Sequence, residues 1–150
     1  MITHFETNKV YMAKGLSTMM YADVAYSLLS ELSKSEIDWG ELPCTQSPLH
    51  VWTRDYMPLQ VCRDRFVLFR YEPDYLNNYP EYKPQVDEII GGLGVDVCHS
   101  SINLDGGNVI SCGDKVIVTD KIFKENPQLT STKLLDELSA LLEAEIVLIP

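Results

Sequence analysis

Long hydrophobic runs and positive charge are both scarce in this sequence. No apolar stretch approaches the roughly 20 residues that cross a bilayer, and the first ten residues lack the basic and apolar regions of a secretory signal. We therefore expect a cytoplasmic protein with no membrane partner. Lys and Arg number 12 against 22 Asp and Glu, which gives a formal net charge of −10. Such a chain repels phosphate backbones, so nucleic acid is not an expected partner and a cationic ligand is favoured.

Cysteine and histidine are present without the spacing of a disulfide framework or a zinc site. No CxxC pair occurs among the four cysteines, which are Cys44, Cys62, Cys98 and Cys112. We expect them to be reduced and buried, and we expect no metal and no cofactor. A calcium site built from Asp105, Asn108 and Asp114 would need five or more oxygen ligands at regular spacing, and that spacing is absent.

An internal repeat of fifty residues organises the chain, which at 150 residues has the length of a single domain. The segment HVWTRDYMPLQVCRDRFVLFR aligns without a gap on SINLDGGNVISCGDKVIVTD, so that Asp55 falls on Asp105 and Cys62 on Cys112. Each copy contains an acidic turn, a strand, a tight polar turn (RDR or GDK) and a second strand. This order predicts two β-hairpins, each preceded by an acidic turn.

The segments around the hairpins repeat as well. Helices are expected near Thr18 to Lys34, Lys83 to Gly92 and Ser131 to Glu143, each followed by an extended segment. One face of the last helix is formed by leucines at positions 134, 135, 138, 141 and 142, and one stripe of the first by Met19, Ala22, Tyr26 and Leu29. The sequence therefore predicts an α/β fold of strand-helix-strand-strand units, at approximately 8–65, 66–115 and 116–150, the third incomplete. The tyrosine- and proline-rich loop EPDYLNNYPEYKP is expected to be a packed crossover or a lid.

The two acidic turns are the candidate binding site. Equivalent turns of repeated units gather at one end, so Asp55 and Asp105 should face one pocket. Gly106 and Gly107 allow a ligand close to the backbone, and Trp52 offers a flat face to a cation. Two carboxylates beside an aromatic ring favour a guanidinium or an amine. The plain alternatives are that Asp105 only forms the turn and that Trp52 is a core residue.

Neighbouring residues of the turns have supporting interpretations. Arg54 is expected to brace Asp55 or the carbonyl groups of the turn, and Asn108 to support the second turn. Cys62 and Cys112 occupy equivalent strand positions and are assigned to the core.

The motif WTRDYMP resembles the tryptophan-x-arginine-aspartate-x-x-proline motif of the agmatine deiminase and bacterial-type peptidylarginine deiminase family. The segment NLDGGNVI, with the following GDKVIVTDKIFKENP, resembles the family's second acidic motif. The resemblance extends from about NKVYMA onward and implies the pentein fold, a propeller of five strand and helix units. It implies hydrolysis of a guanidino group, either agmatine to N-carbamoylputrescine and ammonia in putrescine biosynthesis or peptidyl arginine to citrulline, through a covalent cysteine intermediate.

The same resemblance implies a role for each turn. Asp55 would bind the guanidinium nitrogens, Asp105 would support the catalytic histidine, and Trp52 would lie near the substrate stem. Family members usually carry glutamate at the position of Asp105. The family's histidine and nucleophilic cysteine have no counterpart here, so none of the four cysteines is assigned as nucleophile. We therefore expect the N-terminal part of a deiminase, inactive alone and able to form homo-oligomers, and we keep a non-catalytic binding or assembly fragment as the alternative.

Overall fold

The computed structural model describes residues 1–3, 6–18 and 20–150. By the contacts within the chain these residues form two compact units. The first unit contains residues 1–6, 54–78 and 96–150, and the second contains residues 7–53 and 79–95. No helix in the described ranges is long and apolar enough to cross a membrane.

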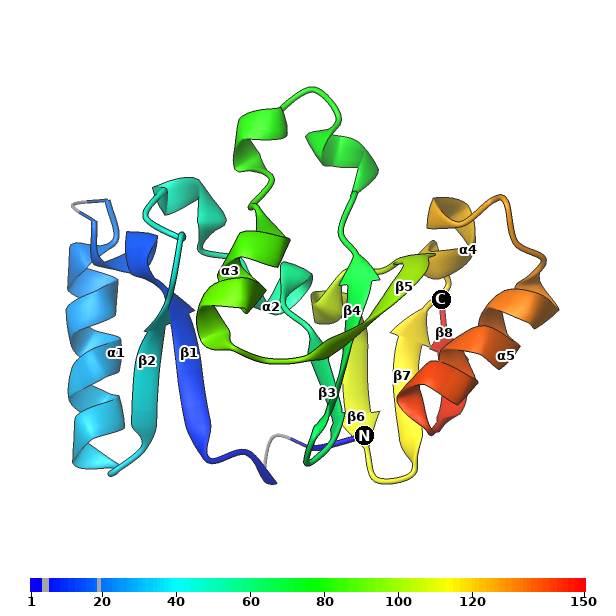
Figure 1. Cartoon of the computed structure of the whole chain (residues 1–150), viewed down its shortest axis with the longest axis horizontal. Coiled ribbons are helices and arrows are strands. Elements are labelled where there is room, and N and C mark those ends of the chain that lie inside the picture. The colour runs from blue at the N-terminus through cyan, green and yellow to red at the C-terminus, as the bar shows by residue number, and fades with distance from the viewer. Residues whose placement is uncertain (4–5, 19) are drawn as a thin grey trace. The chain divides into compact units, whose positions relative to one another are not determined.

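The second unit is built on a parallel strand pair. Strands β1 (Lys9–Ala13) and β2 (Asp38–Leu42) pair with Lys9 opposite Asp38, and helix α1 (Ala22–Lys34) connects them and lies alongside (Figure 1). The unit also contains α3 (Val86–Leu93), which ends where Gly94 takes the left-handed conformation (φ 65°). Gly94 therefore ends the helix, and Gly91 and Gly92 lie inside it.

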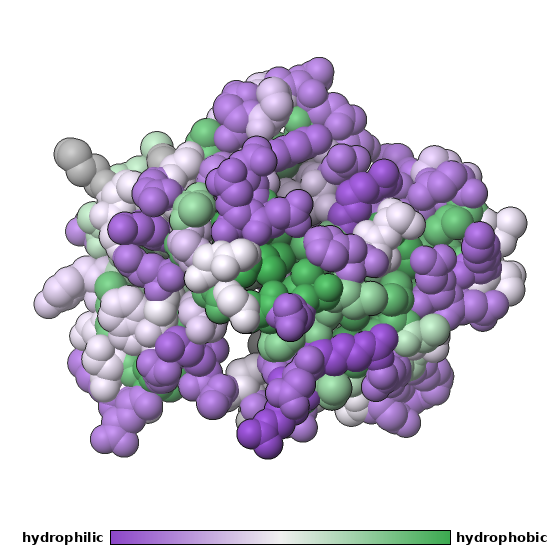
Figure 2. All heavy atoms as spheres, viewed as in Figure 1, coloured by the Kyte–Doolittle hydropathy of each residue, from purple (hydrophilic) through white to green (hydrophobic). Residues whose placement is uncertain are grey.

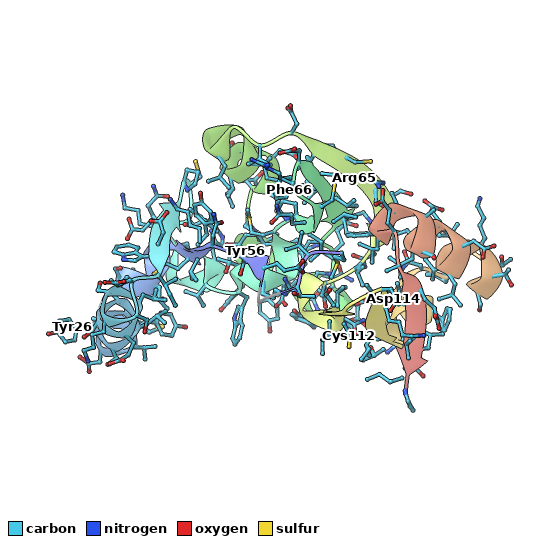
Figure 3. The ribbon with its side chains drawn as sticks, turned by 90° about the horizontal axis from the view of Figure 1, so that it is seen from below. Tyr26, Tyr56, Arg65, Phe66, Cys112 and Asp114 are labelled. Atoms are coloured by element: carbon cyan, nitrogen blue, oxygen red, sulfur yellow. The ribbon has the colours of Figure 1, made fainter. Side chains whose placement is uncertain are left out.

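The face that α1 buries differs from the predicted stripe. Ala25 and Leu32 are buried and Leu29 is half-buried, whereas Tyr26 points outward and is 78% exposed (Figure 3). Ala22 is exposed as well, and Met19 lies outside the described residues. The prediction was wrong because Ala22 and Tyr26 also recur at helical spacing, and spacing alone does not tell which of two such faces meets the strands.

The first unit contains two three-stranded sheets of the same design. In one, β3 (Leu59–Cys62) and β4 (Arg65–Arg70) form an antiparallel hairpin, and β5 (Val97–Asn103) pairs parallel to β4. In the other, β6 (Val109–Cys112) and β7 (Lys115–Thr119) form the hairpin, and β8 (Glu145–Ile149) pairs parallel to β7. The hairpins start fifty residues apart, as the repeat predicts.

Helix α5 (Ser131–Leu142) supplies the largest helical share of the core of the first unit. Leu134, Leu138 and Leu142 are fully buried, which confirms the predicted leucine face, and burial of each such side chain contributes about 1.5–3 kcal/mol. Thr130 caps the helix by accepting a hydrogen bond from the backbone N–H of Lys133. Beyond the helix, Glu143 forms an ion pair with Arg65 of β4.

The four cysteines are free and exposed, so the prediction that they are buried was wrong. Cys62 and Cys112 end the first strands of the two hairpins, opposite Arg65 and Lys115. Side chains alternate along a strand, and the core takes Leu59 and Val61 of β3. The next residue, Cys62, therefore faces solvent, although its side chain is apolar.

The loop between β4 and α3 presents a hydrophilic surface (Figure 2). Three of its tyrosines, Tyr75, Tyr79 and Tyr82, are exposed. These three side chains lie at the surface, whereas Pro73 and Leu76 of the same loop are buried. The loop is thus partly packed, as a crossover would be, and its role as a lid stays a prediction.

Two buried asparagines join the ends of the strands to the connections that follow. Asn103 donates from Nδ2 to the carbonyl of Glu72 (2.8 Å) and accepts from its N–H (2.9 Å). Asn126 bonds the backbone N–H and carbonyl of Asn103 in the same way (2.8 and 2.9 Å) and donates to the carbonyl of Ile122. These side chains fix the point at which the chain leaves β5 for the second acidic turn.

Candidate functional site

The acidic residues of both turns lie in the first unit, and the two turns contact each other. The first is formed by α2 (Thr53–Tyr56), before β3, and the second by the 3-10 turn Gly106–Asn108, before β6. A Cβ atom at Gly106 would lie closer than 3.0 Å to the carbonyl oxygen of Arg54, and one at Gly107 equally close to Oδ1 of Asp55. The two glycines therefore allow a close approach that no other residue would permit.

Asp55 lies close enough to Asp105 for their charges to interact. Burial raises the pKa of the Asp55 carboxyl, and the negative charge of Asp105 raises it further. The backbone N–H of Gly107 donates to Asp55 and, with Lys121 and Arg54, opposes this rise. The structure thus places the two carboxylates close enough to interact, together with the cations of Lys121 and Arg54.

Asp105 is almost fully buried, with 8% of its surface exposed. Its Oδ2 accepts a hydrogen bond from Nζ of Lys121 at 2.6 Å. Its Oδ1 is buried and has no hydrogen-bond partner among the described residues. A buried, unpaired carboxylate oxygen is costly, so Oδ1 is an acceptor that a ligand can satisfy.

Lys121 and Glu125, the first and last residues of α4 (Lys121–Glu125), complete the charged cluster. Nζ of Lys121 lies 3.0 Å from Oε1 of Glu125, whose side chain is 5% exposed. Burial raises the pKa of Glu125, while Lys121 opposes the rise. Burial alone would lower the pKa of Lys121, but the hydrogen bonds with Asp105 and Glu125 raise it above its ordinary value. Lys121 is therefore a cation shared by two carboxylates.

Tyrosines line the same cluster. Nζ of Lys121 lies 5.9 Å from the ring centroid of Tyr75, within the range of a cation–π contact. The pKa of Tyr71 is raised by burial, by a hydrogen bond with Tyr75 and by the charges of Asp55 and Asp105. Its ring also packs on that of Tyr56, with centroids 6.0 Å apart. The carboxylates are thus accompanied by aromatic rings, the combination that binds organic cations.

Sequence analysis missed Lys121, Glu125, Tyr71 and Tyr75 as members of the site. One local signal for them existed, since a Lys and a Glu four residues apart on a short helix face the same way. The tyrosines gave no local signal, because their place beside the acids depends on how the loop returns to the sheet.

The remaining predicted residues have other positions. Arg54 donates from Nη2 to the carbonyl of Val109 at 2.9 Å, a contact that fits a bracing role. Oδ1 of Asn108 accepts from the backbone N–H of Thr119 (3.0 Å) and ties the second turn to β7. Trp52 belongs to the second unit and is 69% exposed, so it is not a core residue.

Solved structures with a similar fold identify the fold of this chain. The chain superposes on an agmatine deiminase of C. jejuni with a TM-score of 0.67, over 98% of its own length and 54% of that chain, at 12% identity. A second match is the Enterococcus faecalis agmatine deiminase (TM-score 0.58, 18% identity, 94% of this chain and 50% of that one). A third is DDAH from Pseudomonas aeruginosa, as a C249S mutant with citrulline (TM-score 0.56, 14% identity, 95% of this chain and 60% of that one). This chain has a pentein fold.

The pentein fold predicted from the sequence is thereby confirmed. No protein-family model and no curated protein matches the chain. The chain spans about half the length of the agmatine deiminases that it matches. The three structures named above are pentein proteins, deiminases or hydrolases that modify guanidino groups.

Proposed function

We propose that this chain forms the cation-binding part of a hydrolase that deiminates a guanidino compound. The observation that carries the proposal is the unpaired Oδ1 of Asp105, buried beside Asp55 in a site of excess negative charge. Each aspartate has one oxygen engaged by the protein, Asp105 by Lys121 and Asp55 by the N–H of Gly107. The remaining oxygens are acceptors for N–H groups on different nitrogens of one planar guanidinium.

Charge favours agmatine as the substrate over peptidyl arginine. The charge of Asp105 interacts with those of Asp55 and Glu125, and Lys121 interacts with all three carboxylates. Agmatine carries a guanidinium and an ammonium, so an acidic site attracts it more strongly than a peptide-bound arginine, whose tail is uncharged. In deimination, water replaces one nitrogen on the guanidinium carbon of agmatine, and that nitrogen leaves as ammonia. The other product, N-carbamoylputrescine, is one candidate source of putrescine.

The chain's own share of this reaction is to bind and orient the substrate. A cysteine thiolate that attacks the guanidinium carbon and a histidine that moves protons are required as well. We assign the nucleophile's role to none of the four exposed cysteines. The chain alone is therefore expected to bind agmatine without turnover in an ammonia-release assay. Turnover that is abolished by mutating one of the four cysteines would contradict this assignment.

Calorimetry with agmatine tests the binding site. Replacing Asp55 by Asn removes the charge and one acceptor, so Asp55→Asn should weaken agmatine binding at least about tenfold. The matched control is Asp114→Asn, the same chemical change at an exposed residue of the β6–β7 turn, which should bind like the parent. Equal affinity of Asp55→Asn and the parent would remove Asp55 from the site. The same titration with N-acetyl-arginine amide, a mimic of peptidyl arginine, tests the choice of substrate. Tighter binding of this compound than of agmatine would favour peptidyl arginine.

A further inference from the structure

The ammonium group of Lys121 occupies a small cage of its own. Two walls of the cage are carboxylate oxygens, Oδ2 of Asp105 at 2.6 Å and Oε1 of Glu125 at 3.0 Å. A third is the ring of Tyr75, whose centroid lies 5.9 Å away. Carboxylates together with an aromatic face are the groups with which proteins hold a free alkylammonium ion.

The two carboxylate walls of this cage are more deeply buried than the group that fills it. The side chains of Asp105 and Glu125 are 11% and 5% exposed, whereas that of Lys121 is 38% exposed. Oδ1 of Asp105 and Oε2 of Glu125 are buried without hydrogen-bond partners in the described part of the chain. The cage thus contains acceptors whose hydrogen bonds Lys121 does not make.

We propose that Lys121 is the internal occupant of an ammonium subsite and a specificity-determining residue that excludes alkylammonium ligands from it. A second ammonium near Asp105 would be repelled by Lys121 and would find Oδ2 already engaged. A guanidinium also carries one positive charge, but it does not need Oδ2, because its planar fork can donate to Oδ1 of Asp105 and to Asp55 from different nitrogens. The consequence, selection of agmatine over putrescine, rests on the proposed function, whereas the existence of the subsite does not.

Removing the occupant tests the subsite directly. Lys121→Ala deletes the three side-chain carbons and the ammonium beyond Cβ, a fragment equivalent to propylammonium. Calorimetry on the whole 150-residue protein should therefore show propylammonium and putrescine binding to Lys121→Ala at least about tenfold more tightly than to the parent. The ratio of agmatine to putrescine affinity should fall by at least about tenfold as well.

Three variants separate this explanation from a general loss of charge. Lys121→Arg refills the cage with a cation and should exclude propylammonium as the parent does. Lys115→Ala removes a lysine from an exposed ion pair with Glu145 in the same unit, and should also behave like the parent. The double variant Lys121→Ala/Glu125→Gln removes one wall and should lose the gain in propylammonium binding.

If Lys121→Ala is too unstable for calorimetry, thermal unfolding measures propylammonium binding instead. A ligand that binds only the folded state raises the melting temperature with its concentration. Propylammonium should thus stabilise Lys121→Ala, or restore its cooperative melting, and leave the parent unchanged. Lys121→Ala without any gain in propylammonium binding or stabilisation overturns the proposal. Agmatine that fails to bind the parent, while Lys121→Ala still gains propylammonium, overturns the proposed function instead.

Discussion

The contact between the two acidic turns can be tested by adding one methyl group at Gly106. In Gly106→Ala the added Cβ would lie closer than 3.0 Å to the carbonyl oxygen of Arg54, 3.3 Å from its carbonyl carbon and 3.5 Å from Cδ2 of Leu59. The first two atoms belong to the backbone and cannot rotate away. One of the turns must therefore move.

The cost follows from the kind of atoms that are displaced. Overpacking a well-packed site costs about 1–3 kcal/mol, and we expect the upper end, about 3 kcal/mol, because the obstacle is backbone on both sides. For a chain of this size, that loss lowers the melting temperature by about 6–12 °C. The movement also displaces Asp55 relative to Asp105, so agmatine binding should weaken in the protein that remains folded.

Thermal unfolding followed by circular dichroism measures the effect, with two glycine controls. Gly91→Ala adds a methyl group in open space within a helix and should be neutral or stabilising by up to about 1 kcal/mol. In Gly107→Ala the obstacle is the side-chain oxygen of Asp55, which can rotate, so a smaller loss of about 1 kcal/mol is expected together with weaker agmatine binding. A melting temperature of Gly106→Ala within about 2 °C of the parent would refute the packing argument.

Two further predictions concern stability. Because the pKa of Asp55 is raised in the folded protein, ionising it disfavours the fold, so its contribution falls as the pH rises above 3.8, the ordinary aspartate value. Asp55→Asn should thus become more stable relative to the parent from about pH 3 to about pH 7, and a constant difference in melting temperature would contradict the raised pKa. Asn126→Ala leaves the buried N–H and carbonyl of Asn103 without partners and should cost about 3 kcal/mol in urea unfolding. A loss below about 1 kcal/mol would mean that water replaces the amide.

The features that could be predicted from the sequence are those with a local cause. The hairpins are determined by the polar turns RDR and GDK and by the strand segments on either side of each turn. In these segments the residues are apolar or alternate between apolar and polar, so no distant residue is needed to predict the hairpin. The leucine face of α5 was clear because the opposite face is charged and polar. The proximity of the two aspartates could be predicted because the repeat places an acid at the same position in both turns, and repeated units bring equivalent turns together.

The features that were missed have tertiary causes. Lys121 belongs to the site only because α4 follows β7 directly and returns to the second turn, and the spacing of Lys121 and Glu125 does not by itself indicate this. The cysteines were placed in the core from their chemistry, although strand alternation decides that Cys62 faces solvent. In α1, two faces carry apolar residues, and only contact with the strands selects between them.

The paired bonds of Asn103 and Asn126 also have a consequence for how the chain reaches its native alignment. Each asparagine side chain presents a C=O and an N–H to a backbone, as the next strand of a sheet would do. A slip of β5 by one residue would turn Asn103 to the opposite face of the sheet and present Ile102 or Leu104 to the amide of Asn126. Neither side chain can bond Glu72, so a slipped strand loses the pair of hydrogen bonds that the side chain of Asn103 makes with the backbone of Glu72. Asn103 thus penalises misaligned pairing of β4 and β5.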